Sequence, residues 1–128
     1  MLSRLYIRNY AIIREVNISF TQGLNIITGE TGAGKSILMG ALNLVLGERA
    51  DKHVLYDAEQ KCIVEATFAD IKGKINPQDI EQEEWDWDWD EEIIIRRELQ
   101  ANGKSRSFIN DTPVTLSALK KLGSWLVD

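Results

Sequence analysis

Hydrophobic and polar residues alternate at the start of the chain. This pattern predicts two β-strands, one from Leu2 to Asn9 and one from Ala11 to Phe20. A turn at Thr21-Gln22-Gly23 separates them from the apolar run Leu24 to Thr28, which has the composition of a short buried strand. Two antiparallel strands followed by a buried strand predict the beginning of a mixed β-sheet.

Helical periodicity follows between Ser36 and Leu46. Apolar residues recur there three and four positions apart, which predicts a helix with one face on the sheet, formed by Leu38, Ala41, Leu42 and Val45. Gly40 inside this pattern lowers the stability of the helix by about 1 kcal/mol relative to Ala. Its presence therefore indicates that helix and strand approach closely at that position, where a larger side chain would not fit. Gly47 is typical of a helix end, and the polar stretch from Glu48 to Tyr56 predicts a loop.

The second half of the chain predicts three more strands or hairpin arms and one helix. They are a strand from Lys61 to Phe68, a strand from Glu92 to Gln100, a turn from Ala101 to Lys104, its partner strand from Ser105 to Asn110 and a helix from Pro113 to Gly123. Thr115 or Ser117 lies near the expected start of that helix. The segment from Ile71 to Gln82 predicts a loop, with room for one helical turn. The final apolar run, Trp125-Leu126-Val127-Asp128, predicts a truncated strand.

An acidic stretch with alternating tryptophans separates two of these strands. Nine of the 20 acidic residues lie between Asp79 and Glu92, a stretch without a basic residue. The net charge of −5 therefore comes from this one stretch and not from the chain as a whole. Trp85, Trp87 and Trp89 alternate there with aspartates, which predicts an extended insert or hairpin within a single domain of residues 1–128. Three roles are open for the row of tryptophans: it caps the sheet, it docks a partner, or it stacks on a base. The carboxylates beside it argue against contact with nucleic acid.

Composition places the chain among ordinary globular domains, with 128 residues, 44% hydrophobic and 27% charged residues. No apolar run approaches the roughly 20 residues of a membrane span, and the first residues lack the layout of a signal peptide. Cys62 is the single cysteine, which excludes an internal disulfide and favours a reducing cytoplasm. Cys62 is expected in the core, and His53, the only histidine, is expected to be a plain loop residue.

Residues 29 to 36 carry the candidate chemistry, because they match the phosphate-binding pattern G-x-x-x-x-G-K-[ST] between a predicted strand and a predicted helix. Glycines allow the backbone to approach phosphate oxygens, and the helix N-terminus adds unpaired N–H donors. Lys35 is expected to reach the β- and γ-phosphates of ATP, and Ser36 to bind Mg²⁺. The predicted nucleotide cradle consists of Gly29, Glu30, Thr31, Gly32, Ala33, Gly34, Lys35 and Ser36.

The residues needed to hydrolyse a bound triphosphate are not found in the sequence. Hydrolysis requires a strand that ends in Asp, often followed by Glu, to hold the metal ion and to position water. After Ser36 no run of four or more apolar residues ends in Asp-Glu, and Leu126-Val127-Asp128 offers one carboxylate only. We therefore expect that the chain is a fragment, or that another chain supplies these residues.

Several motifs together resemble the N-terminal head segment of the RecN family of DNA repair proteins. They are Leu5-x-Ile7-Arg8-Asn9-Tyr10, the stretch from Gly23 to Leu38, Leu46 to Asp51, Ile95-Arg96-Arg97-Glu98, and Gly103 to Asn110. The resemblance covers nearly the whole chain except the acidic tryptophan stretch. It implies an α/β P-loop NTPase fold of the ABC/SMC-head type, here the N-terminal lobe with a mixed β-sheet and flanking helices.

The resemblance also implies partners and further site residues. In this family the C-terminal lobe, with the metal-holding carboxylates, lies far downstream of a coiled coil, and two heads sandwich two ATP molecules in a homodimer that holds DNA. A bacterial cytoplasmic protein associated with the nucleoid is implied, with no membrane partner. Arg49 lies where an arginine in such heads can approach the nucleotide, or is a solvated loop charge. Lys104 and Arg106 could contact DNA phosphates, or protect a strand edge.

Two other functions remain open from the residues. A small P-loop kinase would need an acceptor site and an Arg-rich lid, and the acidic stretch is unsuited to an anionic substrate. A non-catalytic module would use the lobe mainly as a dimerisation surface. If the RecN resemblance holds, the complete protein is an ATPase and the 128-residue chain is inactive alone.

Overall fold

The computed structural model describes residues 1–20, 32–50, 54–71, 75, 78 and 92–126, with backbone only for 32–35. Six strands form one sheet in the order β2-β1-β3-β4-β5-β6, and every neighbouring pair is antiparallel. The strands are β1 (Leu2–Tyr10), β2 (Ile13–Ser19), β3 (Cys62–Ala69), β4 (Glu92–Leu99), β5 (Ser105–Ile109) and β6 (Thr112–Val114). The helices named among the described residues are α1 (Gly32–Val45) and α3 (Leu116–Leu126).

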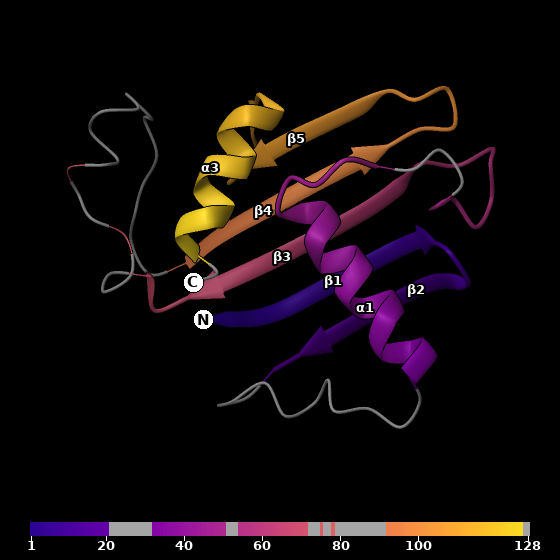
Figure 1. Ribbon diagram of the computed structural model, residues 1–128, viewed down its shortest axis with the longest axis horizontal. Helices are drawn as coiled ribbons and strands as arrows, with labels where there is room; N and C mark the ends of the chain where they lie inside the picture. Colours follow the sequence, from indigo (N-terminus) through magenta and orange to yellow (C-terminus); the bar gives the residue numbers. More distant parts are fainter. Residues whose placement is uncertain (21–31, 51–53, 72–74, 76–77, 79–91, 127–128) are drawn as a thin grey trace.

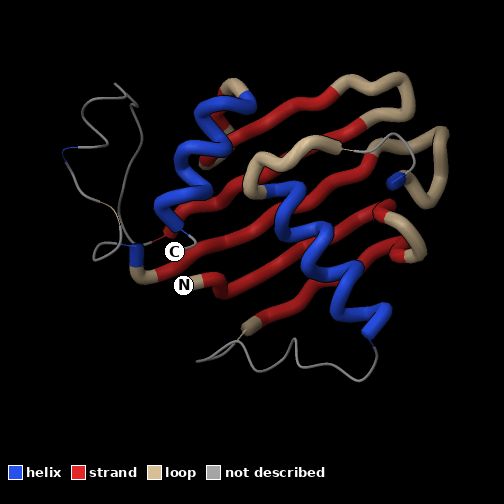
Figure 2. The backbone as a smooth tube through the Cα atoms, viewed as in Figure 1, coloured by secondary structure: helices blue, strands red, loops and turns tan. Residues whose placement is uncertain are grey.

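Both helices cover the same face of the sheet (Figures 1 and 2). Helix α1 crosses β1, β3 and β4, and α3 packs on β5. Strand side chains alternate between the two faces, so in β3 the residues Cys62, Val64, Ala66 and Phe68 are all buried. The helices contribute the other layer of the core with Ala41, Leu44, Val45, Leu119, Leu122 and Leu126.

A tight hairpin joins the last two strands of the sheet. Asn110 and Asp111 connect β5 to β6 with φ angles of 48° and 65°, the left-handed conformation that two-residue hairpin turns require. Asn110 also accepts a hydrogen bond from the backbone N–H of Ile94 at 2.8 Å and donates its own N–H to the Ile94 carbonyl. The turn is thereby fixed to the neighbouring strand β4.

Most of the predicted elements are confirmed among the described residues, and two expectations are wrong. The strands at the start of the chain and on either side of the hairpin turn are present, and Thr115 caps α3 through its hydroxyl, which accepts from the Ala118 N–H at 3.1 Å. The helix does not begin at Pro113, which lies in β6, and it does not end at Gly123. Trp125 and Leu126, expected in a strand, belong to α3 because Leu126 completes its buried face.

Three expectations fall outside the described residues. They concern the buried strand from Leu24 to Thr28, most of the loop between Ile71 and Gln82, and the acidic tryptophan stretch. The described strands thus give the antiparallel portion of the expected sheet. The boundaries of the single domain stay a prediction.

Helix α1 lies very close to β1 at Gly40, as its glycine predicted. A Cβ atom at this position would lie 2.6 Å from the hydroxyl oxygen of Tyr10. Tyr10 is partly buried, and burial raises the pKa of its hydroxyl. The glycine therefore serves the contact between helix and strand.

We expect Gly40→Ala to be unfavourable in the native chain and favourable when Tyr10 is replaced by Phe. The added methyl group overpacks the contact at a cost of about 1–2 kcal/mol, whereas without the hydroxyl the higher helix propensity of Ala can contribute up to about 1 kcal/mol. Urea unfolding of the two single variants and the double variant measures this coupling. Additive effects on the free energy of unfolding would show that the two residues do not compete for space.

Candidate functional site: the two ends of helix α1

The phosphate-binding motif lies at the N-terminus of α1. The helix begins at Gly32, so the second half of the motif forms its first turn, while Gly29, Glu30 and Thr31 lie outside the described residues. The first four N–H groups of a helix have no partner within it, and the positive end of the helix dipole lies there. No acidic residue occupies this first turn. The backbone is therefore arranged to receive an anion.

The donor set fits a nucleotide better than it fits a metal ion by itself. Ser36 is exposed in the helix, so its hydroxyl is available to an ion held next to the phosphates. Among the described residues no group of three or more His, Cys, Asp or Glu side chains could hold a metal. Besides the hydroxyl of Ser36, Mg²⁺ would therefore need oxygen ligands from the nucleotide and from residues other than the described ones. The side chain of Lys35 is not among those described.

The opposite end of α1 is held by a buried arginine. Arg97, in β4, is 2% exposed and its Nη1 donates to the carbonyl of Leu44 at 2.8 Å and to the carbonyl of Glu48. Its Nε donates to the hydroxyl of Ser105 in β5 at 3.2 Å. Burial lowers the pKa of the guanidinium, and a cation at a helix C-terminus is favoured by the dipole.

Arg49 follows directly after this clamped end. It is exposed, and it lines a cavity of about 250 Å³ together with Arg97, Leu55, Gly103 and Ser105, among others. Because α1 has 14 residues, its two ends lie about 20 Å apart. Arg49 therefore lies near the C-terminal end of α1, whereas the phosphate motif lies at the N-terminal end. A contact of Arg49 with a nucleotide stays a prediction.

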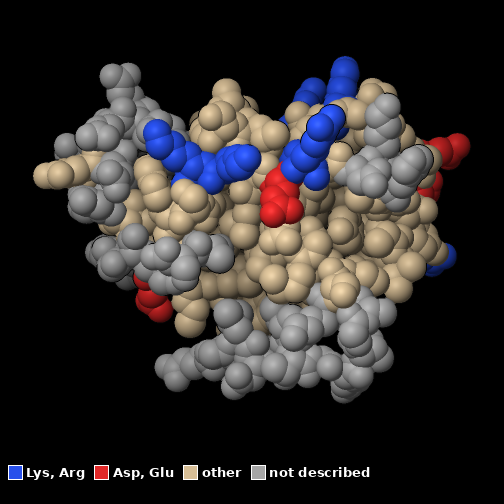
Figure 3. Space-filling model, in the orientation of Figure 1, with Lys and Arg blue, Asp and Glu red and all other residues tan. Residues whose placement is uncertain are grey.

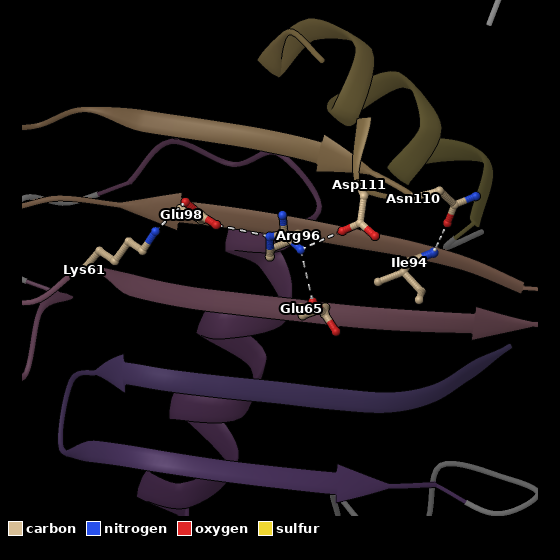
Figure 4. Close-up of polar contacts among 7 residues, drawn as sticks. All are labelled: Lys61, Glu65, Ile94, Arg96, Glu98, Asn110 and Asp111. Atoms are coloured by element: carbon tan, nitrogen blue, oxygen red, sulfur yellow. Dashed lines mark hydrogen bonds and ion pairs between the residues drawn. The ribbon is translucent and has the colours of Figure 1, made fainter. Parts of the chain in front are cut away.

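The face of the sheet opposite α1 and α3, here called the helix-free face because no described helix lies on it, carries a network of ion pairs centred on Arg96 (Figure 4). Arg96 contacts Glu98 at 3.2 Å, Asp111 at 3.0 Å and Glu65 at 3.7 Å, and its guanidinium lies 4.4 Å from the ring centre of Phe108. Lys61 contacts Glu98 at 3.1 Å. Since three carboxylates surround two cations, this part of the surface is a poor site for phosphate.

Lys104 and Arg106 lie on the β4–β5 hairpin, as expected, and both are exposed. Figure 3 shows Lys and Arg side chains gathered along the edge of the helix face that carries α3 and β5. Lys120 and Lys121 of α3 are also exposed. This edge is the most basic one in that view, and contact with DNA is a prediction for it.

Cys62 is a core residue, as predicted, and His53 lies outside the described residues. Burial raises the pKa of the Cys62 thiol to about 12, although the nearby Arg97 acts in the opposite direction. A thiol of this kind stays protonated and is a poor nucleophile or metal ligand at neutral pH.

The raised pKa makes stability depend on pH in the alkaline range. The folded chain holds the thiol proton more tightly than the unfolded chain, so this contribution is complete below about pH 9 and is lost as the pH rises towards 12. We expect the free energy of unfolding to fall over this range by up to about 1.4 kcal/mol per pH unit for this group. Urea unfolding at several pH values measures the slope.

Cys62→Ala is the control for this dependence, because the raised pKa values of Tyr6 and Tyr10 act in the same direction and remain in the variant. The slope should be smaller in the variant. A thiol reagent should label the native chain slowly and the unfolded chain fully at pH 8. Fast labelling of the native chain would contradict the burial of Cys62.

The sequence did not indicate two residues that organise this part of the fold. Arg97 shares the inward face of β4 with Ile93 and Ile95, and only the packing of α1 on this face reveals what its guanidinium contacts. Asn9, 3% exposed with φ of 58°, donates from Nδ2 to the carbonyls of Asp57 and Gln60 and accepts from the Asp57 N–H. A polar residue at an inward-facing position of a strand is the one signal that points to each of them.

Comparison with known proteins agrees with this geometry. The RecF/RecN/SMC N terminal domain family matches residues 1–124. The chain is 41% identical to the DNA repair protein RecN of Haemophilus influenzae over 99% of its length, and 37% identical to RecN of Bacillus subtilis over its full length. It spans only 23% and 22% of these two relatives, or about a quarter of their length.

Solved structures show the same fold at low sequence identity. The SMC head domain of Thermotoga maritima aligns with a TM-score of 0.60 at 22% identity, over 94% of this chain and 41% of that one. A structure from work on ATP-driven dimerization of SMC ATPases reaches 0.72 at 20% identity, over 98% and 78%. The recombination mediator RecF with ATP reaches 0.67 at 18% identity, over 93% and 30%.

These likenesses confirm the fold class predicted from the motifs, an α/β P-loop ATPase fold of the ABC/SMC-head type. None of the described helices is long and apolar enough to cross a membrane. The match of the family to nearly the whole chain includes both the phosphate motif and the hairpin that carries Arg97. The chain therefore belongs to the RecF/RecN/SMC N-terminal domain family, and within that family it is similar to the N-terminal part of RecN.

Proposed function

We propose that the chain is the ATP-binding N-terminal lobe of a RecN-type DNA repair ATPase. The observation that carries the proposal is the complete motif from Gly29 to Ser36 at the N-terminus of α1, in a chain that is similar to RecN along its whole length. The open helix N-terminus supplies backbone donors to the phosphates, Lys35 supplies a positive charge, and Ser36 supplies an oxygen ligand for Mg²⁺. Bound Mg²⁺ would neutralise phosphate charge.

The lobe binds nucleotide but leaves hydrolysis to other residues of the complete protein. The described residues offer no carboxylate cluster for a metal, and the chain corresponds to about a quarter of its RecN relatives. A C-terminal lobe of the same protein would supply the missing Asp and Glu. The pairing of two such heads around ATP follows from the same proposal and is supported by the likeness to a structure from work on ATP-driven dimerization of SMC ATPases.

The proposed setting is DNA repair in a bacterial cytoplasm, at the nucleoid. The curated relatives are DNA repair proteins of bacteria. In the complete protein DNA would contact the basic edge through Lys104 and Arg106, because exposed cations gain by replacing the counterions of phosphates. The helix-free face is less suited to this role, since its cations are already paired with carboxylates.

A comparison of turnover and binding tests the proposal. We expect the purified 128-residue chain to bind ATP weakly and to hydrolyse it at no more than the background rate. The same lobe joined to its second half should hydrolyse ATP at the roughly 1 s⁻¹ or faster that is typical of enzymes. Robust turnover by the chain alone that disappears in Lys35→Ala would contradict the division of labour, and transfer of phosphate to a small acceptor would indicate a kinase instead.

A further inference from the structure

A cavity between the segment after α1 and the β4–β5 hairpin is lined by two arginines and, among the described residues, by no carboxylate. Its volume is about 250 Å³. The segment after α1 contributes Arg49, and the hairpin contributes Arg97, Gln100 and Ser105. The other described lining residues bring no charge: they are Ala50, Val54, Leu55, Leu99 and Gly103. The described wall of this cavity is therefore positively charged.

Arg97 has one nitrogen atom to spare at this wall. Its side chain is 2% exposed, and its Nη1 donates to the carbonyl of Leu44 at 2.8 Å and to that of Glu48. Its Nε donates to the hydroxyl of Ser105 at 3.2 Å. A guanidinium has five N–H donors, so the two on Nη2 have no acceptor among the described residues. Because buried donors are almost always hydrogen-bonded, these two call for an acceptor from outside the described residues.

The charge of Arg97 also lacks a negative partner among the described residues. It forms no ion pair with a described carboxylate, whereas its neighbour Arg96 on the helix-free face has three in reach. Cys62 lies near Arg97, but burial raises the pKa of this thiol to about 12, so it carries no charge at neutral pH. The carbonyls at the end of α1 supply only partial negative charge. A buried charge is costly unless it is paired.

Three further donors line the same cavity. Arg49 is exposed and forms no ion pair with a described residue. The Ser105 hydroxyl accepts from Arg97 and keeps its own hydrogen to donate, and the Gln100 amide adds two N–H donors. Guanidinium groups bind carboxylates and phosphates through short, charge-assisted hydrogen bonds. Because pockets for larger ligands measure roughly 300–1,000 Å³, this one suits a small anion better than a nucleotide.

We propose that this cavity binds a small oxyanion, a free phosphate or carboxylate ion, through Nη2 of Arg97, the guanidinium of Arg49 and the hydroxyl of Ser105. The anion supplies the negative charge and the acceptor atoms that the buried guanidinium lacks. It also joins the segment after α1 to the β4–β5 hairpin, because its ligands come from both. The site is separate from the phosphate motif at the other end of α1 and does not rest on the proposed function.

NMR titration of the 128-residue chain tests the proposal. The probes are inorganic phosphate and, separately, acetate, each compared with chloride at equal ionic strength. The signal to follow is the side-chain Nε–H of Arg97, which is buried and hydrogen-bonded to Ser105. We expect a saturable shift with half-saturation at roughly millimolar concentration, as suits a ligand of a few atoms. The probe that saturates the signal at the lower concentration identifies the preferred anion.

Four variants locate the site. Arg49→Met should weaken anion binding by about tenfold or more, since it removes a charged hydrogen bond. Arg97→Lys keeps the charge but lacks Nη2, and should weaken binding similarly when the Arg49 signal is followed. Arg96→Met is the matched control, because it removes the same charge on the helix-free face, and it should change binding by no more than about twofold. In Lys35→Ala the shift should persist, which separates this cavity from the phosphate motif.

Several results would overturn the proposal. One is the absence of a saturable shift with either probe beyond the effect of chloride. Equal weakening in Arg49→Met and Arg96→Met would show that net charge governs the response, and loss of the shift in Lys35→Ala would assign it to the phosphate motif. A shift that appears only in Asp51→Asn would mean that a carboxylate of the chain itself fills the cavity. If Arg97→Lys does not fold, Arg49→Met decides alone.

Discussion

Lys35→Ala is expected to weaken ATP binding to the chain by about 10- to 100-fold, which corresponds to a charged hydrogen bond of about 1.5–3 kcal/mol. The helix N-terminus of α1 attracts phosphate through its free N–H groups and its dipole, but these act on any anion. The lysine of the motif is the component that reaches the terminal phosphates and makes binding sensitive to their number. Binding of ATP should therefore suffer more than binding of ADP.

Isothermal titration of ATP and ADP in the presence of Mg²⁺ measures the two affinities. Lys61→Ala is the matched control, because this lysine lies on the helix-free face and contacts Glu98 at 3.1 Å. The control removes the same charge and should leave ATP binding within about twofold, since exposed charges far apart are largely screened. Equal losses in both variants would show that net charge, and not the motif, governs binding.

Gly47→Ala is expected to destabilise the fold by about 3 kcal/mol or more, the largest effect of any glycine substitution in the described chain. Gly47 has φ of 108°, a conformation that residues with a Cβ rarely adopt. A Cβ there would also lie 2.8 Å from the backbone Cα of Lys120, which cannot move without shifting α3. Strain and overpacking therefore act together.

Gly103→Ala separates these two causes. Gly103 has φ of 89°, but a Cβ would meet nothing within 4 Å. Its replacement should therefore show only the conformational cost, about 1 kcal/mol. Urea unfolding of both variants, compared at equal m-values, gives the difference. If the two variants lose the same stability, the contact between α1 and α3 at Gly47 is looser than the structure shows.

The two experiments address opposite ends of α1, and the sequence predicted the structure of one end better than that of the other. The helix and its motif were predictable, because the glycines, the lysine and the serine occur at fixed spacing and the apolar residues follow the helical period. Strands were equally predictable where inward-facing apolar residues recur at every second position, as in β3. These features depend on residues a few positions apart, and such residues are neighbours in the sequence as well as in the structure.

The short strand β6 shows where local interpretation failed. The sequence pattern predicts a helix from Pro113, but Asn110-Asp111 forms a tight turn that pairs Thr112–Val114 with β5. The pair of residues able to adopt positive φ was a usable signal. The end of α3 was missed for a related reason, since three or four apolar residues fit a buried strand as well as the buried side of a helix.

The sequence by itself determined the family of the chain, the nucleotide motif, the alternating strands and the absence of a second cysteine. Only the tertiary structure decided the role of Arg97, the close approach of Gly40 to Tyr10 and of Gly47 to α3, and the pairing of carboxylates with Arg96. The reason is physical. Motifs and periodicity depend on residues a few positions apart. The pairs that the fold brings together here, Arg97–Leu44, Gly40–Tyr10, Gly47–Lys120 and Arg96–Glu65, are 30 to 73 positions apart, and sequence spacing does not record which distant groups come into contact.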